Sequence, residues 1–189
     1  EFLVVWDEVR DDSRDVRGVR LTSGGVVLDT SGIRVSPPGG EQSCPAVAHG
    51  ASDFLVVWEE GMNRDRDVRG VRVNSAGRVL DSASILIAGR AWEQCGPAVA
   101  SDDANFLVAW QAPGTGGYEV YCARVSRTGL LLDTTGIPVC TSDGSQSMST
   151  VTASGVRMRV QSTGMRTVPG RTEAVRYSPS MCEPRSISR

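Results

Sequence analysis

One apolar pattern recurs along the chain at a fixed spacing. The run Phe-Leu-Val-Val-Trp begins at Phe2, returns at Phe54 and, with one Val replaced by Ala, begins again at Phe106, each time 52 residues later. Aligned without a gap, residues 2–53 match residues 54–105 at 25 of 52 positions. A repeat of this length indicates one supersecondary unit copied along the chain, so a stack or a ring of such units is expected.

A single copy, residues 45–96, has the pattern of four short strands joined by turns. Residues 45–48 form a first apolar run, and residues 54–58 are apolar on both alternate faces, so this second strand must be covered on both sides. Residues 67–73 alternate apolar and polar positions, which is typical of a half-exposed strand, and residues 85–87 supply the fourth. No segment keeps a helical period over three turns.

Four short strands with a doubly buried second strand predict an all-β fold built from β-propeller blades, four-stranded antiparallel sheets that pack face to face. A stacked β-solenoid is the alternative. The blade boundaries expected within the repeat region, residues 1–155, are a partial blade at 1–44, blades at 45–96 and 97–148, and the start of the next at 149–155. These are about three blade equivalents of an incomplete or open propeller. Propellers close with 4–8 blades, so we expect either a piece of a longer protein or a ring completed by self-association.

The repeat pattern ends after Gly155. Residues 156–189 hold seven Arg and two Glu with little periodicity. Three interpretations remain open for this irregular Arg-rich tail: a degraded repeat, a disordered basic segment, or translation in a shifted reading frame.

Charge and composition argue against two kinds of partner, a nucleic acid and a membrane. Residues 1–155 carry 13 Arg against 20 Asp and Glu, a net charge of −7, which argues against nucleic-acid binding because that needs a cationic surface. No apolar run approaches the roughly 18 residues of a membrane span.

The five cysteines, at 44, 95, 122, 140 and 182, lack zinc-ligand spacing. Cys44 and Cys95 stand one position apart in the repeat, which leaves open a disulfide between neighbouring repeats or two separate thiols.

Polar side chains that recur in every copy are expected to be structural, because each blade needs them whereas a ring needs one catalytic site. We expect the Arg and Asp members to satisfy strand-end hydrogen bonds and to pair across strands. The alternative is a cluster of arginines converging on a carboxylate ligand. The recurring structural residues are Trp6, Trp58 and Trp110, expected to fill the gaps between blades, with Arg20, Arg72 and Arg124 and with Asp29, Asp81 and Asp133.

Two features are candidates for a binding site. Asn63, Asp65 and Asp67 place three oxygen ligands on alternate residues, a spacing that suits calcium, although Arg64 and Arg66 interleave with them. The other interpretation is a solvated turn with local ion pairs. Trp92, which the other copies lack, could offer a stacking surface to a ligand or cap a blade edge. Calcium is the single cofactor that the sequence suggests.

The repeated motifs resemble those of known proteins. Phe-Leu-Val-Val-Trp, Asp-Val-Arg-Gly-Val-Arg, Gly-x-Val-Leu-Asp and Gln-x-x-Pro-Ala-Val-Ala over residues 1–155 are similar to the tandem repeats of secreted or cell-surface bacterial β-propeller proteins, with a blade layout like that of sialidase-like and integrin-type propellers. The resemblance implies an extracytoplasmic location. The aspartate box of sialidases (Ser-x-Asp-x-Gly-x-x-Trp) is absent, and the calcium loop of integrin-type blades is not matched in full.

These observations predict a non-catalytic, extracytoplasmic propeller module that binds a protein or glycan partner through its blade loops. No nucleophile elbow, phosphate loop or metalloprotease motif accompanies the single histidine, His49. Carboxylates brought together from different blades could still hydrolyse a glycosidic bond, because spacing along the chain does not report the distance between them. The alternative function is therefore part of a sialidase- or glycosidase-like propeller enzyme.

Overall fold

The structure, a computed structural model, describes residues 1–10, 13–89, 93–115, 117–140, 145–154, 157–168 and 171–176; from residue 145 onward it describes the backbone and, of the side chains, that of Gln146. Strands and turns make up this part of the chain. Within it, no helix is long and apolar enough to cross a membrane.

The strands form four antiparallel sheets, which we name A to D in chain order. Sheet A contains β1 (Phe2–Arg10), β2 (Ser13–Leu21) and β3 (Ile33–Arg34). Sheet B contains β4 (Gln42–His49), β5 (Asp53–Met62), β6 (Asp65–Asn74) and β7 (Ile85–Ala88). Sheet C contains β8 (Cys95–Ser101), β9 (Asn105–Gly114), β10 (Gly117–Ser126) and β11 (Ile137–Cys140). Sheet D contains β12 (Ser145–Ser154), β13 (Arg157–Val168) and β14 (Arg171–Arg176).

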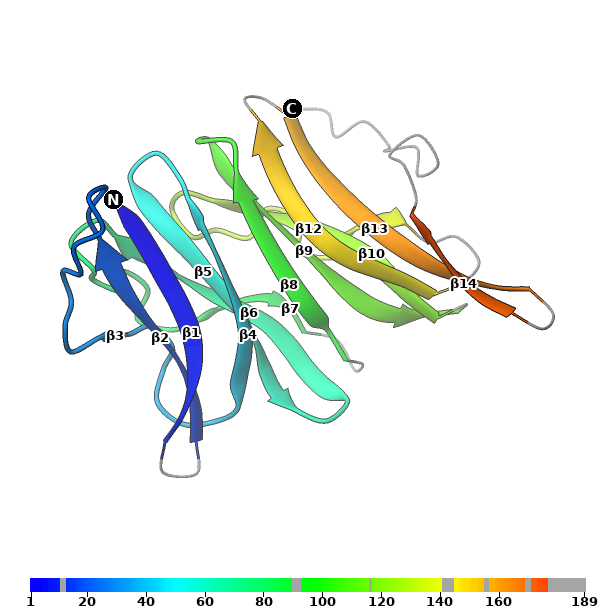
Figure 1. Cartoon of the computed structure of the whole chain (residues 1–189), viewed down its shortest axis with the longest axis horizontal. Helices are drawn as coiled ribbons and strands as arrows, with labels where there is room; N and C mark the ends of the chain where they lie inside the picture. Colours follow the sequence, from blue (N-terminus) through cyan, green and yellow to red (C-terminus); the bar gives the residue numbers. More distant parts are fainter. Residues whose placement is uncertain are drawn as a thin grey trace.

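The sheets follow one another side by side, with sheet A at one end and sheet D at the other (Figure 1). Each is a meander in which consecutive strands pair. This is the predicted all-β architecture of propeller blades, and the two end sheets do not meet, so the array is open rather than a closed ring (Figure 1). Sheet A lacks the first strand that β4 and β8 provide in sheets B and C.

The second strand of each complete blade is buried on both faces, as its apolar run predicts. In β5, Phe54, Val56 and Trp58 point into one apolar cluster with residues of sheet A, while Leu55 and Val57 point into another with residues of sheet C. The cluster between sheets A and B also contains Leu3, Val16 and Val35. A strand with two apolar faces therefore holds three layers together, since each face removes its side chains from water against a different neighbour.

The three recurring tryptophans do not share one environment. Trp58 lies between sheets A and B and is fully buried, and Trp110 lies between sheets B and C and is 4% exposed. Trp6 is 37% exposed, so the expectation that it fills a gap between blades is wrong for these sheets. The reason is positional: Leu3 and Val5, but not Trp6, belong to the apolar cluster shared with sheet B, and no described sheet precedes sheet A.

A bulge in the first strand of each later sheet explains where the strands begin. The register shifts between Ser43 and Ala46 in β4 and between Cys95 and Ala98 in β8. Pro45 lies in this bulge, where its missing N–H costs no ladder bond, so β4 starts at Gln42 rather than at the expected boundary of residue 45.

Sheet D continues the repeat beyond the point where its sequence pattern ends. β13 and β14 pair antiparallel in a meander with β12 and occupy residues 157–168 and 171–176. The 52-residue spacing places the counterparts of β9 and β10 at 157–166 and 169–178. The backbone of this segment therefore follows the blade layout up to Arg176, and residues 177–189 lie outside the described part.

The recurring arginines and aspartates form one clasp in each of sheets A, B and C. In sheet B, the Arg72 guanidinium donates to both carboxylate oxygens of Asp81 at 2.6–3.1 Å, and the Arg72 backbone N–H donates to Asp81 Oδ2 at 2.7 Å. The pairs Arg20–Asp29 and Arg124–Asp133 have the same geometry. Hydrogen bonds from the arginine hold the pKa of Asp29 and of Asp133 below its ordinary value.

The arginine of one blade also reaches the next. Arg20 Nη1 donates to the backbone carbonyl of Ser75 at 2.6 Å, and Arg72 Nη1 donates to that of Arg127 at 2.8 Å. Both acceptors lie in the turn after the third strand of the following sheet, 55 residues further on. The clasp therefore closes the edge of its own blade and ties it to its neighbour.

The different burial of two equivalent tryptophans gives a stability prediction. Trp58→Ala should lower the free energy of unfolding by about 3–5 kcal/mol, because it leaves a cavity between two sheets. Trp6→Ala, on the uncovered face, should cost about 1 kcal/mol or less. Urea denaturation followed by circular dichroism measures both, and equal losses would contradict the assignment of Trp58 to the core.

The clasps predict acid sensitivity. A carboxyl whose pKa is lower in the folded than in the unfolded state stabilises the fold above its unfolded pKa, about 3.9, and this contribution disappears as the pH falls through the folded value. The free energy of unfolding should therefore fall as the pH drops below about 4, and Asp133→Asn should reduce that fall. Asp65→Asn, which removes an exposed carboxylate, serves as the control. An acid dependence that is the same in wild type and Asp133→Asn would refute the role of the clasp.

Candidate functional site

An open cleft of about 830 Å³ lies where two neighbouring blades present the turns between their second and third strands. The β5–β6 turn supplies Met62, Asn63, Arg64 and Asp65. The β9–β10 turn supplies Pro113, Gly114, Gly117 and Tyr118, and Glu93 comes from the connection between sheets B and C. The cleft thus exists because blade packing places two hairpin ends and one inter-blade connection side by side.

A buried carboxylate, Glu59, and a half-buried arginine, Arg66, form an ion pair next to the cleft residues. Glu59, 3% exposed at the end of β5, accepts from Arg66 Nη1 at 2.7 Å and from the backbone N–H of Gly96 at 2.8 Å. Arg66 Nη2 lies 3.4 Å from Glu93 Oε1. One guanidinium therefore bridges two carboxylates that stand 34 residues apart in the chain and belong to different loops.

Tyr118 completes the network on the cleft wall. Its hydroxyl donates to Glu93 Oε2 at 2.7 Å, and this bond, with burial, raises the pKa of Tyr118 to about 12. Glu93 is thereby engaged on both oxygens, by Arg66 on one and by Tyr118 on the other. The arrangement fixes a neutral phenol ring beside an exposed arginine, Arg64, which suits recognition of a polar ligand by stacking and hydrogen bonding.

Two cysteines lie close to Glu59 but are not joined. Cys44 and Cys95 are both free thiols, which favours the second of the two alternatives left open by the sequence. Burial, followed by the charges of Glu59 and Glu93, raises the pKa of Cys95 to about 11, so its thiol stays protonated at neutral pH. Cys44 adopts a φ of +52°, where the next repeat has Gly96 at +60°.

The three residues of the calcium candidate do not all line the cleft. Asn63 and Asp65 line the cleft, whereas Asp67 is outside its lining and lies 3.5 Å from Arg69. Within the described residues, no group of three or more His, Cys, Asp and Glu side chains is placed to hold a metal ion. A calcium site would need the Asn63 amide and further oxygens, and it stays a prediction. The other candidate, Trp92, lies outside the described residues.

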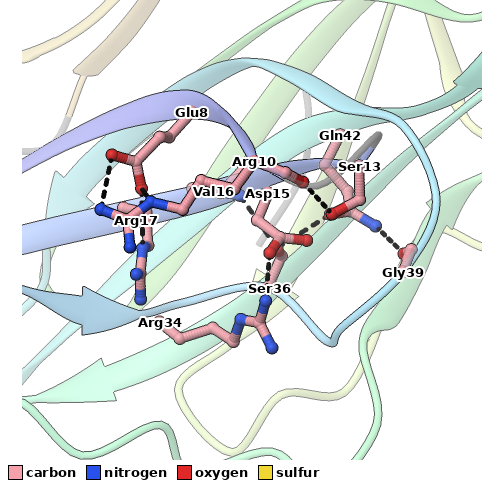
Figure 2. Close-up of polar contacts among 10 residues, drawn as sticks. All are labelled: Glu8, Arg10, Ser13, Asp15, Val16, Arg17, Arg34, Ser36, Gly39 and Gln42. Atoms are coloured by element: carbon pink, nitrogen blue, oxygen red, sulfur yellow. Dashed lines mark hydrogen bonds and ion pairs between the residues drawn. The ribbon is translucent and has the colours of Figure 1, made fainter.

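Sheet A carries its own polar contacts, at the positions that correspond to Glu60, Asp67 and Arg69 of the next repeat (Figure 2). Glu8 accepts from Arg17 Nε at 3.1 Å and from Arg10 Nη2 at 3.0 Å, and these bonds, that of Arg17 first, lower the pKa of Glu8. Arg34 pairs with the buried Asp15. These ion pairs link β1, β2 and β3 of sheet A to one another.

Gln42 and Gln94 occupy equivalent positions in the repeat but have different buried hydrogen-bond partners. Gln94 Oε1 accepts from Trp110 Nε1 at 2.8 Å. Gln42, its counterpart, instead accepts at Oε1 from the Ser36 hydroxyl at 3.0 Å (Figure 2). The residue at the Ser36 position in the next repeat is Ala88, which has no hydroxyl to offer. Trp58 Nε1 consequently has no acceptor within the described part of the chain.

Sequence reasoning placed the β5–β6 loop among the candidates and missed the other half of the cleft. Tyr118 departs from the repeat, since it replaces the Arg66 of the preceding copy, whereas Glu93 repeats Glu41 and so carries no signal of its own. The two residues stand on separate loops, and no sequence motif joins them. The recurring arginines do not converge on the cleft; each stays with the aspartate of its own blade.

The bridge through Arg66 gives a prediction with a matched control. Arg66→Ala leaves the buried Glu59 carboxylate without its ion-pair partner, which should cost about 2–3 kcal/mol of unfolding free energy. Arg64→Ala, two residues earlier and exposed, should change stability by about 0.5 kcal/mol or less. Thermal and urea unfolding of the two variants make the comparison, and equal effects would show that the bridge is not structural.

Comparison with known proteins supports the fold. No protein-family model matches the chain, and no curated protein matches its sequence. Among solved structures, the chain is similar to an endo-arabinase from Bacteroides thetaiotaomicron VPI-5482, with a TM-score of 0.57 and 10% sequence identity over 93% of this chain and 70% of that one. At this identity the likeness shows a shared all-β propeller fold, and it does not carry the activity across.

Proposed function

We propose that the chain is a non-catalytic β-propeller module that acts outside the cytoplasm and binds a protein or glycan partner in the cleft between sheets B and C. The observation that carries the proposal is the cleft itself, which is open, lies at the loop end of two blades and combines an exposed arginine with an aromatic wall. The extracytoplasmic location rests on the resemblance of the repeats to secreted and cell-surface propellers.

The state of the carboxylates favours binding over catalysis. A glycosidase of the common type needs two carboxyl groups with room for substrate between them, one to donate a proton and one to act as base or nucleophile. Glu59 and Glu93 share one guanidinium, and Glu93 also accepts from Tyr118. Both are therefore held by donors of the protein rather than presented to a ligand.

A glycan-processing function is the second candidate. It is favoured by the likeness to the endo-arabinase and by the presence of two carboxylates, Glu93 and Asp65, in the lining of one open cleft. In that case the cleft would hold a sugar chain and Glu93 would act on it directly.

Ligand screening with two matched variants tests the proposal. A glycan array and a panel of extracellular proteins should reveal a ligand whose affinity falls about tenfold, or about 1.4 kcal/mol, in Arg64→Ala. Arg78→Ala removes an equally exposed arginine from a turn outside the cleft and should leave binding unchanged. Equal losses in both variants would show that binding is a diffuse charge effect.

A substrate panel of polysaccharides and aryl glycosides separates the two candidates. The binding module should show no turnover above background. Turnover that Glu93→Gln abolishes, in a variant with an unchanged circular dichroism spectrum, would overturn the proposal in favour of the enzyme.

A further inference from the structure

The outer face of sheet A carries side chains that are buried at the same positions in sheets B and C. Phe2, Val4 and Trp6 are 60%, 48% and 37% exposed. Their counterparts on β5, Phe54, Val56 and Trp58, are 4%, 0% and 0% exposed because sheet A covers them. The counterparts on β9 are covered in the same way by sheet B. This apolar face is therefore a blade-to-blade contact surface without its blade.

A second observation concerns the turn glycines. A Cβ added to Gly77 would lie 2.8 Å from Arg20 Nε, and one added to Gly129 would lie 3.0 Å from Arg72 Nε, so each glycine seats the arginine of the preceding blade. Gly25 has the same position in sheet A and the same left-handed backbone, with a φ of +81°, yet no atom lies within 4 Å of its added Cβ. Sheet A therefore has the same space beside its turn glycine, which we call the glycine seat, but no described residue fills it.

A third observation is the acceptor beside that seat. The carbonyls of Ser75 and Arg127 each accept from the preceding blade's arginine. Ser23 occupies this position in sheet A, 52 and 104 residues earlier, and is exposed. Val27, counterpart of the partly buried Val79, is 45% exposed. The apolar face, the glycine seat and the carbonyl acceptor thus lie on the same side of sheet A.

We propose that this surface, made of Phe2, Val4, Trp6, Val27 and the Ser23–Gly25 turn, docks a further blade of the same 52-residue repeat. The partner presents an apolar face like that of Leu3, Val5 and Val16, and an arginine that reaches the Ser23 carbonyl. The two established interfaces, A with B and B with C, define how it sits.

An unrelated apolar partner would account for the exposed side chains but not for the glycine seat or the acceptor. Two copies meeting through this same face would also fail, because both would offer the acceptor and neither would supply the arginine. A blade of this repeat is the partner that satisfies all three features.

The proposal is tested by supplying such a blade to the full chain. A copy of residues 42–104 placed directly before Glu1 keeps the 52-residue register, since Asn105 is the counterpart of Glu1 two repeats later. It adds one complete sheet and a first strand for sheet A. Oxidative footprinting with mass spectrometry follows Trp6, whose peptide differs in sequence from the added one. Its oxidation rate should fall about tenfold, and the melting temperature should rise.

A control fusion carries Arg72→Ala in the added copy only. It should still shield Trp6 but show a smaller rise in melting temperature, because the apolar contact remains and the hydrogen bond to Ser23 is lost. The proposal is overturned if Trp6 stays as reactive as in the unfused chain, or if the added unit remains sensitive to protease. A dimer of the unfused chain in which the two Trp6 peptides cross-link to each other would also overturn it, since the face would then meet its own copy instead of a blade that supplies the arginine.

Discussion

The fold depends on one constraint: the second strand of each repeat is apolar on both faces and needs a sheet on each side. Val56 and Val57 are neighbours in β5, yet they belong to different apolar clusters, one shared with sheet A and one with sheet C. Because successive side chains of a strand point to opposite faces, no single blade can bury this run by itself. Stacking is therefore a requirement of the blade, and the order of the sheets follows from it.

Most of the ion pairs lie around this stack, at the two ends of the strands. On one side, each arginine clasp closes its own blade, and those of Arg20 and Arg72 also hold the next blade through a backbone carbonyl. On the other side, hairpin ends approach one another, and Glu59, Arg66 and Glu93 join loops that the apolar layers have already positioned. The cleft is the space left between two such ends, so its shape is set by the packing of sheets B and C.

The sequence predicted the strand layout because the 52-residue spacing and the alternation of apolar positions are local signals. It also identified the Arg and Asp members of the clasp, since both recur in every copy. It could not show that Arg72 reaches Arg127, because an ion pair within the blade already explained its recurrence. Glu93 and Tyr118 escaped notice because their contact is a distance between loops, which neither the repeated Glu93, the counterpart of Glu41, nor the unrepeated Tyr118 encodes. The uncovered state of Trp6 depends on which sheet stands beside it, which its own residues do not encode.

The forward reach of the arginine has a genetic consequence. The arginine contact between neighbouring sheets recurs with the donor in one unit and its acceptor 55 residues later, in the following unit. Unequal recombination that gains or loses whole repeats would therefore create or remove a finished junction in a single step. Lineages of such genes can vary in copy number without evolving any new interface.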